Sequence, residues 1–175
     1  MSILQILQYP DLRLRRKSHK VTDVKSSRIK KIIKDMLETL ANTGNCAALA
    51  ATQLDIEQPP SIIVINSMDD DDGVLCLINP QIIAQEGHDV AEEGCMSVFQ
   101  GDIYANVKRA TKITVKTLDV HGKQVEFTEE GYLARCIQHE YDHLNGILYI
   151  DHLSKLKRAF LEKKMKKLNP HLEKT

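Results

Sequence analysis

Apolar side chains recur at steps of three and four along residues 26–42, at positions 29, 32, 33, 36, 37 and 40. Such spacing places them on one face of a helix. Ser26 or Ser27 can supply the N-cap oxygen that accepts from the free backbone N–H groups of the first turn. The pattern therefore predicts an amphipathic helix over this range.

Two short apolar runs come next, SIIVIN at 61–66 and VLCLIN at 74–79. Both are rich in β-branched residues and predict strands. The four aspartates at 69–72 between them repel one another, which favours a solvated turn. Further along, KITVKTLDVHGKQVEF at 112–127 alternates apolar and polar residues on either side of DVHGK, which predicts a β-hairpin.

The hairpin leads into a second helical pattern. Thr128 offers an N-cap hydroxyl, and the two glutamates after it suit the positive end of a helix dipole. Apolar residues at 133, 137 and 144 then share one face, and Asn145 with Gly146 predicts the end of the helix. A last helix is predicted over 154–168. Together these segments predict one α+β domain over residues 1–175, with mixed or antiparallel sheets.

Composition narrows the classes of function. The chain has 175 residues, 42% apolar and 27% charged, with 24 basic and 24 acidic side chains. This balance, with no Trp and 5% aromatic residues, gives no indication of DNA binding. The N-terminus lacks a basic region before an apolar run, and no stretch has the length of a membrane span, so we expect a cytoplasmic protein. Its four cysteines are then expected to be thiols or ligands.

The second helical pattern carries QHEYDHLNG, which contains His139, Glu140 and His143. Histidines four residues apart lie one turn apart on the same helix face, so both imidazoles can bind one metal ion. The glutamate, one position further around, can reach a water on that metal. A catalytic site needs a third protein ligand. Glu162 in the last helix and Cys95 in EEGCMS are both candidates, and the residues alone leave the choice open.

The order EGCMS followed by QHEYDHLNG resembles the peptide deformylase family, whose corresponding motifs are EGCLS and QHExDHLxG. ILQYPDLRLR near the N-terminus, LAATQL at 49–54, NP at 79–80 and GYLARCIQHE also resemble family segments and occur in the family order. The resemblance spans most of the chain. It implies an α+β domain in which the HExxH helix is central and packs in a sheet-lined cleft.

The resemblance also implies a metal and a reaction. By motif position, Cys95, His139 and His143 are expected to hold one Fe²⁺, which Zn²⁺ or Ni²⁺ can replace. The family removes the N-formyl group from the initiator methionine of nascent polypeptides by hydrolysis. A metal-bound hydroxide is the nucleophile, and formate and a free α-amine are the products.

Three residues are expected, by resemblance, to act on the substrate. Glu140 is the general acid and base. The side-chain amide of Gln53 and the backbone N–H of Met96 donate to the formyl oxygen. Glu93 and Arg109 also match family positions, and we expect them to pair and hold the EGCMS loop.

The first motif departs from the family. Where the family has GxGLAA, this chain has CAALAA at 46–51, so Cys46 and Ala48 replace both glycines. A side chain at either position can narrow a groove in which a peptide backbone lies. The residues expected to line this groove are Cys46, Ala48, Leu49, Glu93, Tyr132 and Cys136.

Two alternative functions follow from the same features. The first is a zinc peptidase in which Glu162 completes the HExxH site. The second is a diverged, non-catalytic family member that binds formylated or other N-termini, which the altered first motif motivates.

The C-terminal helix and tail, residues 155–175, are strongly basic. Eight Lys or Arg stand against two Glu over 154–175. In the family such a helix can dock on the ribosome, where phosphates favour basic side chains. The alternative is a helix that packs through Leu156, Phe160 and Leu168 and leaves a solvated basic face.

Overall fold

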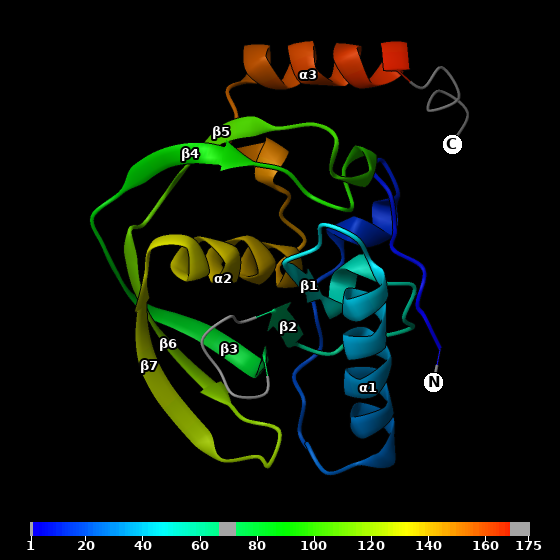
Figure 1. Cartoon of the computed structure of the whole chain (residues 1–175), viewed down its shortest axis with the longest axis vertical. Coiled ribbons are helices and arrows are strands. Elements are labelled where there is room, and N and C mark those ends of the chain that lie inside the picture. The colour runs from blue at the N-terminus through cyan, green and yellow to red at the C-terminus, as the bar shows by residue number, and fades with distance from the viewer. Residues whose placement is uncertain (1, 67–72, 169–175) are drawn as a thin grey trace.

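The computed structural model describes residues 2–66 and 73–168 of the chain. Over these residues the main helices and strands are α1 (Ser27–Asn42), β1 (Ala48–Ala50), β2 (Ile62–Asn66), β3 (Val74–Glu86), β4 (Asp89–Glu93), β5 (Ala105–Arg109), β6 (Lys112–Leu118), β7 (Gln124–Glu130), α2 (Gly131–Leu144) and α3 (Lys155–Leu168). Neighbouring strands are antiparallel, in one sheet of order β1-β2-β3-β6-β7 and a second of β4 and β5. The predicted α+β class is confirmed (Figure 1). The acidic run at 69–72 lies outside the described residues.

The helix predicted over 26–42 is confirmed as α1. The Ser26 hydroxyl oxygen caps it by accepting from the Ile29 N–H at 3.4 Å. Both predicted apolar strands are also present, and the second continues beyond the predicted range to Glu86. The hairpin of β6 and β7 is confirmed around residues 119–123.

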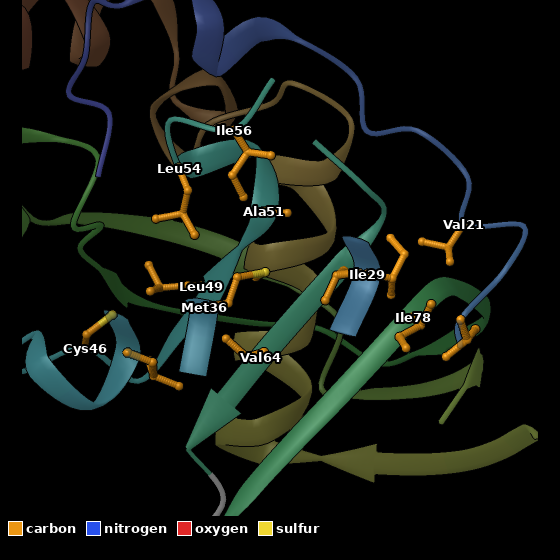
Figure 2. Close-up of a cluster of buried hydrophobic side chains, with 13 residues drawn as sticks. Val21, Ile29, Met36, Cys46, Leu49, Ala51, Leu54, Ile56, Val64 and Ile78 are labelled. Carbon is orange, nitrogen blue, oxygen red and sulfur yellow. The ribbon is translucent and has the colours of Figure 1, made fainter. Parts of the chain in front are cut away.

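β1 and most of β2 are buried on both of their faces, to which alternate residues of each strand point. On one face, Leu49 of β1 and Val64 of β2 belong to a buried cluster with Met36 of α1 (Figure 2). On the other face, Ile63 of β2 shares a cluster with Ile137 of α2. α1 therefore packs on one face of the sheet and α2 on the other.

α2 begins later than predicted. Thr128 does not cap it, because β7 continues through Glu130 and the helix starts at Gly131. β7 stays in register with β6 to its last residue, where Lys112 and Glu130 form an ion pair of 3.1 Å. The Thr128 hydroxyl lies 3.0 Å from that of Thr114 across the two strands. Strand pairing thus outweighs the local signal for a helix start.

The predicted end of α2 is confirmed. The helix ends at Leu144 with Asn145 as its C-cap, and Gly146 adopts a φ of 73°. An added Cβ at Gly146 would also lie 2.4 Å from the backbone oxygen of Arg15, so this position requires glycine. In Figure 1, α2 runs between the large sheet and the pair β4–β5. This arrangement buries half of the residues of α2, with His139, Glu140 and His143 among them.

α3 packs on the body through a face other than the one expected. Leu161 and Met165 are buried in a cluster with the N-terminal segment and the loop after β4. The expected packing through Leu156, Phe160 and Leu168 is wrong, since these side chains are 82%, 74% and 57% exposed. Among the described residues, no helix combines the length and apolarity that a membrane crossing requires.

Candidate metal centre and active site

Three buried side chains converge beside α2. The Sγ of Cys95 lies 3.2 Å from Nε2 of His143, which in turn lies 3.2 Å from Nε2 of His139. All three donor atoms lie within 4.8 Å of one another. The two histidines come from successive turns of α2. Cys95 comes from the turn after β4, which the Val98 N–H closes by donating to the Cys95 carbonyl at 2.9 Å.

The arrangement of these donors suits a tetrahedral metal ion. Metal–nitrogen distances of about 2.0–2.1 Å and a metal–sulfur distance of about 2.3 Å place neighbouring donors about 3.3–3.6 Å apart. The two observed separations of 3.2 Å are close to this spacing. Three protein donors leave a fourth position for water or substrate, which is the composition of a catalytic site. Cys95, His139 and His143 can therefore hold a catalytic metal ion.

A carboxylate fixes the orientation of one imidazole. The Nδ1–H of His139 donates to Oε2 of Glu93 at 2.9 Å, which leaves Nε2 of that ring as the metal donor. Arg109 donates two hydrogen bonds to the same carboxylate, at 2.9 and 3.0 Å. Burial by itself would raise the pKa of Glu93, but the hydrogen bonds from His139 and Arg109 hold that pKa well below its usual range. Glu93 and Arg109 thus pair as expected.

Sequence reasoning missed a second arginine on this carboxylate. Arg135 donates through Nη1 to Oε1 of Glu93 at 2.7 Å and to the Val107 carbonyl at 3.0 Å. Its other terminal nitrogen pairs with Asp89. The available signal was the spacing of four residues between Arg135 and His139, which puts both on one helix face. These contacts tie α2 to β4 and β5.

Glu140 faces the same site without a hydrogen-bond partner for one of its oxygens. The residue is 4% exposed, and its Oε2 has no partner among the described residues. Burial raises the pKa of Glu140 to about 7. An unpaired buried carboxylate is costly for folding, so such a group is a candidate for proton transfer or binding. With a pKa near neutrality it can both accept and release a proton.

Two hydrogen-bond donors border the metal ligands. Oε1 of Gln53 accepts from the Ala50 N–H at 2.8 Å, which turns Nε2 toward Sγ of Cys95 at 3.5 Å and the Ser97 hydroxyl at 3.2 Å. The N–H of Met96 has no acceptor within the part of the chain that the structure describes. Gln53 and Met96 both line the pocket beside Cys95 and His139, so a carbonyl group bound in that pocket can meet these donors.

A pocket of about 290 Å³ opens beside these groups. The expected groove residues that line it are Cys46, Ala48, Glu93, Tyr132 and Cys136. The expectation for Leu49 is wrong, because its side chain is fully buried in the cluster under α1 (Figure 2). Alternation along β1 turns Ala48 toward α2 and Leu49 away from it.

Glu162, the other candidate for third ligand, is engaged elsewhere. Its Oε1 accepts from the Tyr9 hydroxyl at 2.8 Å and from Nε of Arg158 at 2.9 Å. It does not belong to the donor cluster found within residues 2–66 and 73–168. The zinc-peptidase arrangement therefore lacks its carboxylate ligand, and Cys95 stands in that position.

Comparison with known proteins agrees with this geometry. The family model described as polypeptide deformylase matches residues 3–159. Peptide deformylase 1 of Coxiella burnetii is 48% identical over 166 residues, which are 95% of this chain and 96% of that protein. The crystal structure of a peptide deformylase from Legionella pneumophila has a TM-score of 0.84 at 38% identity and covers 99% of each chain. A peptide deformylase structure from Acinetobacter baumannii with Met-Ala-Ser bound has a TM-score of 0.77 at 28% identity, covering 86% of this chain and 98% of that one. With the family model and these relatives matched over nearly its whole length, the chain belongs to the polypeptide deformylase family.

Proposed function

We propose that this chain hydrolyses the N-formyl group from the N-terminal formyl-methionine of newly made polypeptides and releases formate and a free α-amine. The observation that supports this most is the buried carboxylate of Glu140, with one oxygen unpaired, beside the donors Cys95, His139 and His143. The Acinetobacter baumannii relative binds Met-Ala-Ser. That peptide has the free methionyl N-terminus that such a reaction would produce.

The residues divide the hydrolysis between them. A divalent metal ion lowers the pKa of water toward about 7 and so supplies a nucleophile at neutral pH. Glu140 accepts the proton of the attacking water and returns it to the departing amine as the C–N bond breaks. Nε2 of Gln53 and the N–H of Met96 donate to the formyl oxygen, where negative charge develops. Such a donor is typically worth about 3 kcal/mol in the transition state.

We assign Fe²⁺ as the metal, with Zn²⁺ or Ni²⁺ able to replace it. A thiolate beside two imidazoles is a softer donor set than three imidazoles and suits Fe²⁺ and Zn²⁺ alike. All four cysteines are free. Free thiols accord with a reducing compartment, so we assign the reaction to the cytoplasm, where nascent chains emerge.

Formate release from formyl-Met-Ala-Ser tests the proposed reaction directly. Protein loaded with Fe²⁺ under anaerobic conditions is expected to release one formate per peptide and to leave Met-Ala-Ser intact. Cleavage of an internal peptide bond would instead support the peptidase alternative. Tight peptide binding without turnover would support the non-catalytic alternative.

Cys46 stands where a substrate backbone is expected to lie. β1 is the edge strand of its sheet, and because the Asn66 N–H donates to the Ala47 carbonyl, the carbonyl of Ala48 faces away from β2. The thiol of Cys46 donates to that carbonyl at 3.2 Å. Burial raises the pKa of Cys46 to about 12, so the thiol keeps its proton. A peptide that pairs with β1 competes with this thiol for the Ala48 carbonyl.

Cys46→Gly is therefore expected to lower KM for formyl-Met-Ala-Ser about fivefold with kcat nearly unchanged, since one hydrogen bond is worth about 1 kcal/mol. Cys46→Ser keeps a donor of similar size and is expected to keep the wild-type KM. Michaelis curves of the three proteins, loaded with the same metal, check this. Equal KM values for wild type and Cys46→Gly would mean that the thiol does not compete with the substrate.

We further propose that the groove between α3 and residues 103–106 docks on the ribosome. Leu156 and Phe160 are exposed there, and together with Lys157 and Lys164 they line a groove of about 540 Å³. Lysines around exposed apolar side chains suit a surface that offers phosphates and apolar contacts together.

The combined variant Phe160→Ser, Lys164→Glu is expected to co-sediment less with ribosomes, and added salt is expected to weaken binding of the wild type. Deleting α3 would be a poorer test, because Leu161 and Met165 belong to the core. Leu12→Ser, at a side chain that is 83% exposed in a different segment, is the control. Unchanged co-sedimentation of the combined variant would contradict the assignment of this groove.

A further inference from the structure

The N-terminal segment reaches both sides of the active site. The Leu7 N–H donates to the Gln53 carbonyl at 2.8 Å, and the Tyr9 N–H donates to the Ser97 carbonyl at 2.7 Å. Residues 7–9 thus bridge the backbone of one substrate-facing donor, Gln53, and the loop that carries the other. Gln8, between these two anchors, is half-buried, and its side chain extends toward that loop.

Both the nitrogen and the oxygen of the Gln8 side-chain amide form hydrogen bonds with the loop after Cys95. Its Nε2 donates to the Met96 carbonyl at 2.7 Å, and its Oε1 accepts from the Gln100 N–H at 3.1 Å. One side chain therefore spans the loop from residue 96 to residue 100. No other residue within the described ranges donates a side-chain hydrogen bond to the Met96 carbonyl.

The first of these bonds acts on a peptide group next to the metal ligand. The Met96 carbonyl and the Ser97 N–H belong to one planar peptide unit and point in opposite directions. Gln8 holds the carbonyl, and at the other end the Ser97 N–H donates to Sγ of Cys95 at 3.4 Å. Rotation of this unit would move the Ser97 N–H off the sulfur. It would also turn the adjoining peptide unit, which carries the Met96 N–H.

The second bond acts on a strained part of the same loop. Phe99 and Gln100 have φ values of 53° and 54°, in the left-handed region that non-glycine side chains disfavour. Such residues persist only where their surroundings hold them. The bond from the Gln100 N–H to Gln8 is one such restraint. Loss of this bond would remove one of the restraints that hold Phe99 and Gln100 at positive φ.

We propose that Gln8 is a positioning residue of the active site: it fixes the peptide unit that aims the Ser97 N–H at Cys95 and presents the Met96 N–H to the substrate. This inference rests on the proposed function, because it takes Cys95 as a metal ligand and Met96 as a donor to the formyl oxygen. A hydrogen bond to a ligating thiolate withdraws charge from the sulfur, so Gln8 also tunes the metal that the sulfur binds.

Two substitutions separate the two ends of the amide. Gln8→Leu removes both hydrogen bonds, whereas Gln8→Glu keeps the acceptor for the Gln100 N–H and loses the donor to the Met96 carbonyl. Gln5→Leu, the same change three residues earlier at an exposed side chain, is the matched control. Each protein is prepared with Co²⁺, whose thiolate-to-metal absorption band reports on the sulfur, and with Fe²⁺ for kinetics.

Gln8→Leu and Gln8→Glu are expected to lower kcat for formyl-Met-Ala-Ser about tenfold with little change in KM. Removing a donor to the developing oxyanion typically lowers kcat about 10²–10³-fold, and a Met96 N–H that is only misaligned is expected to cost part of that loss. Both are expected to shift the cobalt band, and Gln5→Leu to leave rate and band unchanged. A lowered thermal midpoint with unchanged kcat and band would overturn the proposal, because it indicates a merely structural clamp.

The cobalt band also separates this inference from the proposed function. A shifted band in the Gln8 variants of a protein that releases no formate would support the positioning role while the proposed reaction fails. An unshifted band and unchanged kcat in variants of an active enzyme would overturn the positioning role alone.

Discussion

Replacing Glu140 with alanine is expected to lower formate release about 10²- to 10⁴-fold, the contribution typical of a positioned general acid and base. The metal is expected to stay bound, because Glu140 is not one of the three clustered donors. The thermal midpoint is expected to fall less than in most large-to-small core substitutions. The reason is that the change also removes a buried carboxylate with an unpaired oxygen, which is itself costly for folding. Turnover of formyl-Met-Ala-Ser, metal analysis and thermal unfolding check the three expectations.

Glu140→Gln is the matched control for this result. It keeps the size of the side chain and cannot take up a proton, so it is expected to be as inactive as the alanine variant while filling the same space. Equal formate release by wild type and both variants would rule out a proton-transfer role. Loss of metal together with loss of activity would instead place Glu140 among the residues that hold the ion.

The histidine pair could be predicted from the sequence because its geometry is local. Two residues four apart in a helix must lie on one face, whatever the rest of the chain does. The third donor has no such rule. Cys95 and His143 are 48 residues apart and meet only after β4, the loop and α2 have packed. Residue chemistry left Cys95 and Glu162 open, and only the family resemblance favoured the cysteine.

The start of α2 shows why a local signal can fail. Thr128 and the two glutamates that follow have the composition of a helix N-terminus, yet they form the last residues of β7. The competing strand, β6, lies earlier in the chain and offers seven paired positions. The few residues around Thr128 contain no information about their pairing with β6, so the boundary between β7 and α2 could not be predicted from them.

α3 shows a different limit. Leu156 with Phe160, and Leu161 with Met165, are both spaced by four residues, so periodicity alone offers two apolar faces. The structure buries the second pair and exposes the first. The choice is made by the apolar cluster beneath α3, which includes Leu7, Val98 and Ile150 from three distant segments. The hydrogen bonds of Gln8 and Arg135 depend on packing in the same way.

Cys95→Ser is expected to abolish tight metal binding, whereas Glu162→Gln is expected to retain it. A serine hydroxyl binds a metal ion much more weakly than a thiolate does. Even the loss of a residue that only hydrogen-bonds to a metal ligand typically lowers the affinity for the metal about 10- to 100-fold. The serine variant is therefore expected to lose more than about 100-fold, and formate release with it. Metal content after dialysis against a weak chelator measures the difference.

Glu162→Gln serves as the control because it changes a carboxylate that the alternative site would require. Its cost is expected to be under about 1 kcal/mol of unfolding free energy, since the Glu162 and Arg158 side chains are each 34% exposed and the pair is screened by solvent. Full metal occupancy and activity in Cys95→Ser, with both lost in Glu162→Gln, would reverse the ligand assignment in favour of a peptidase. The reverse outcome is expected because Sγ of Cys95 lies 3.2 Å from Nε2 of His143, while Oε1 of Glu162 accepts hydrogen bonds from Tyr9 and Arg158.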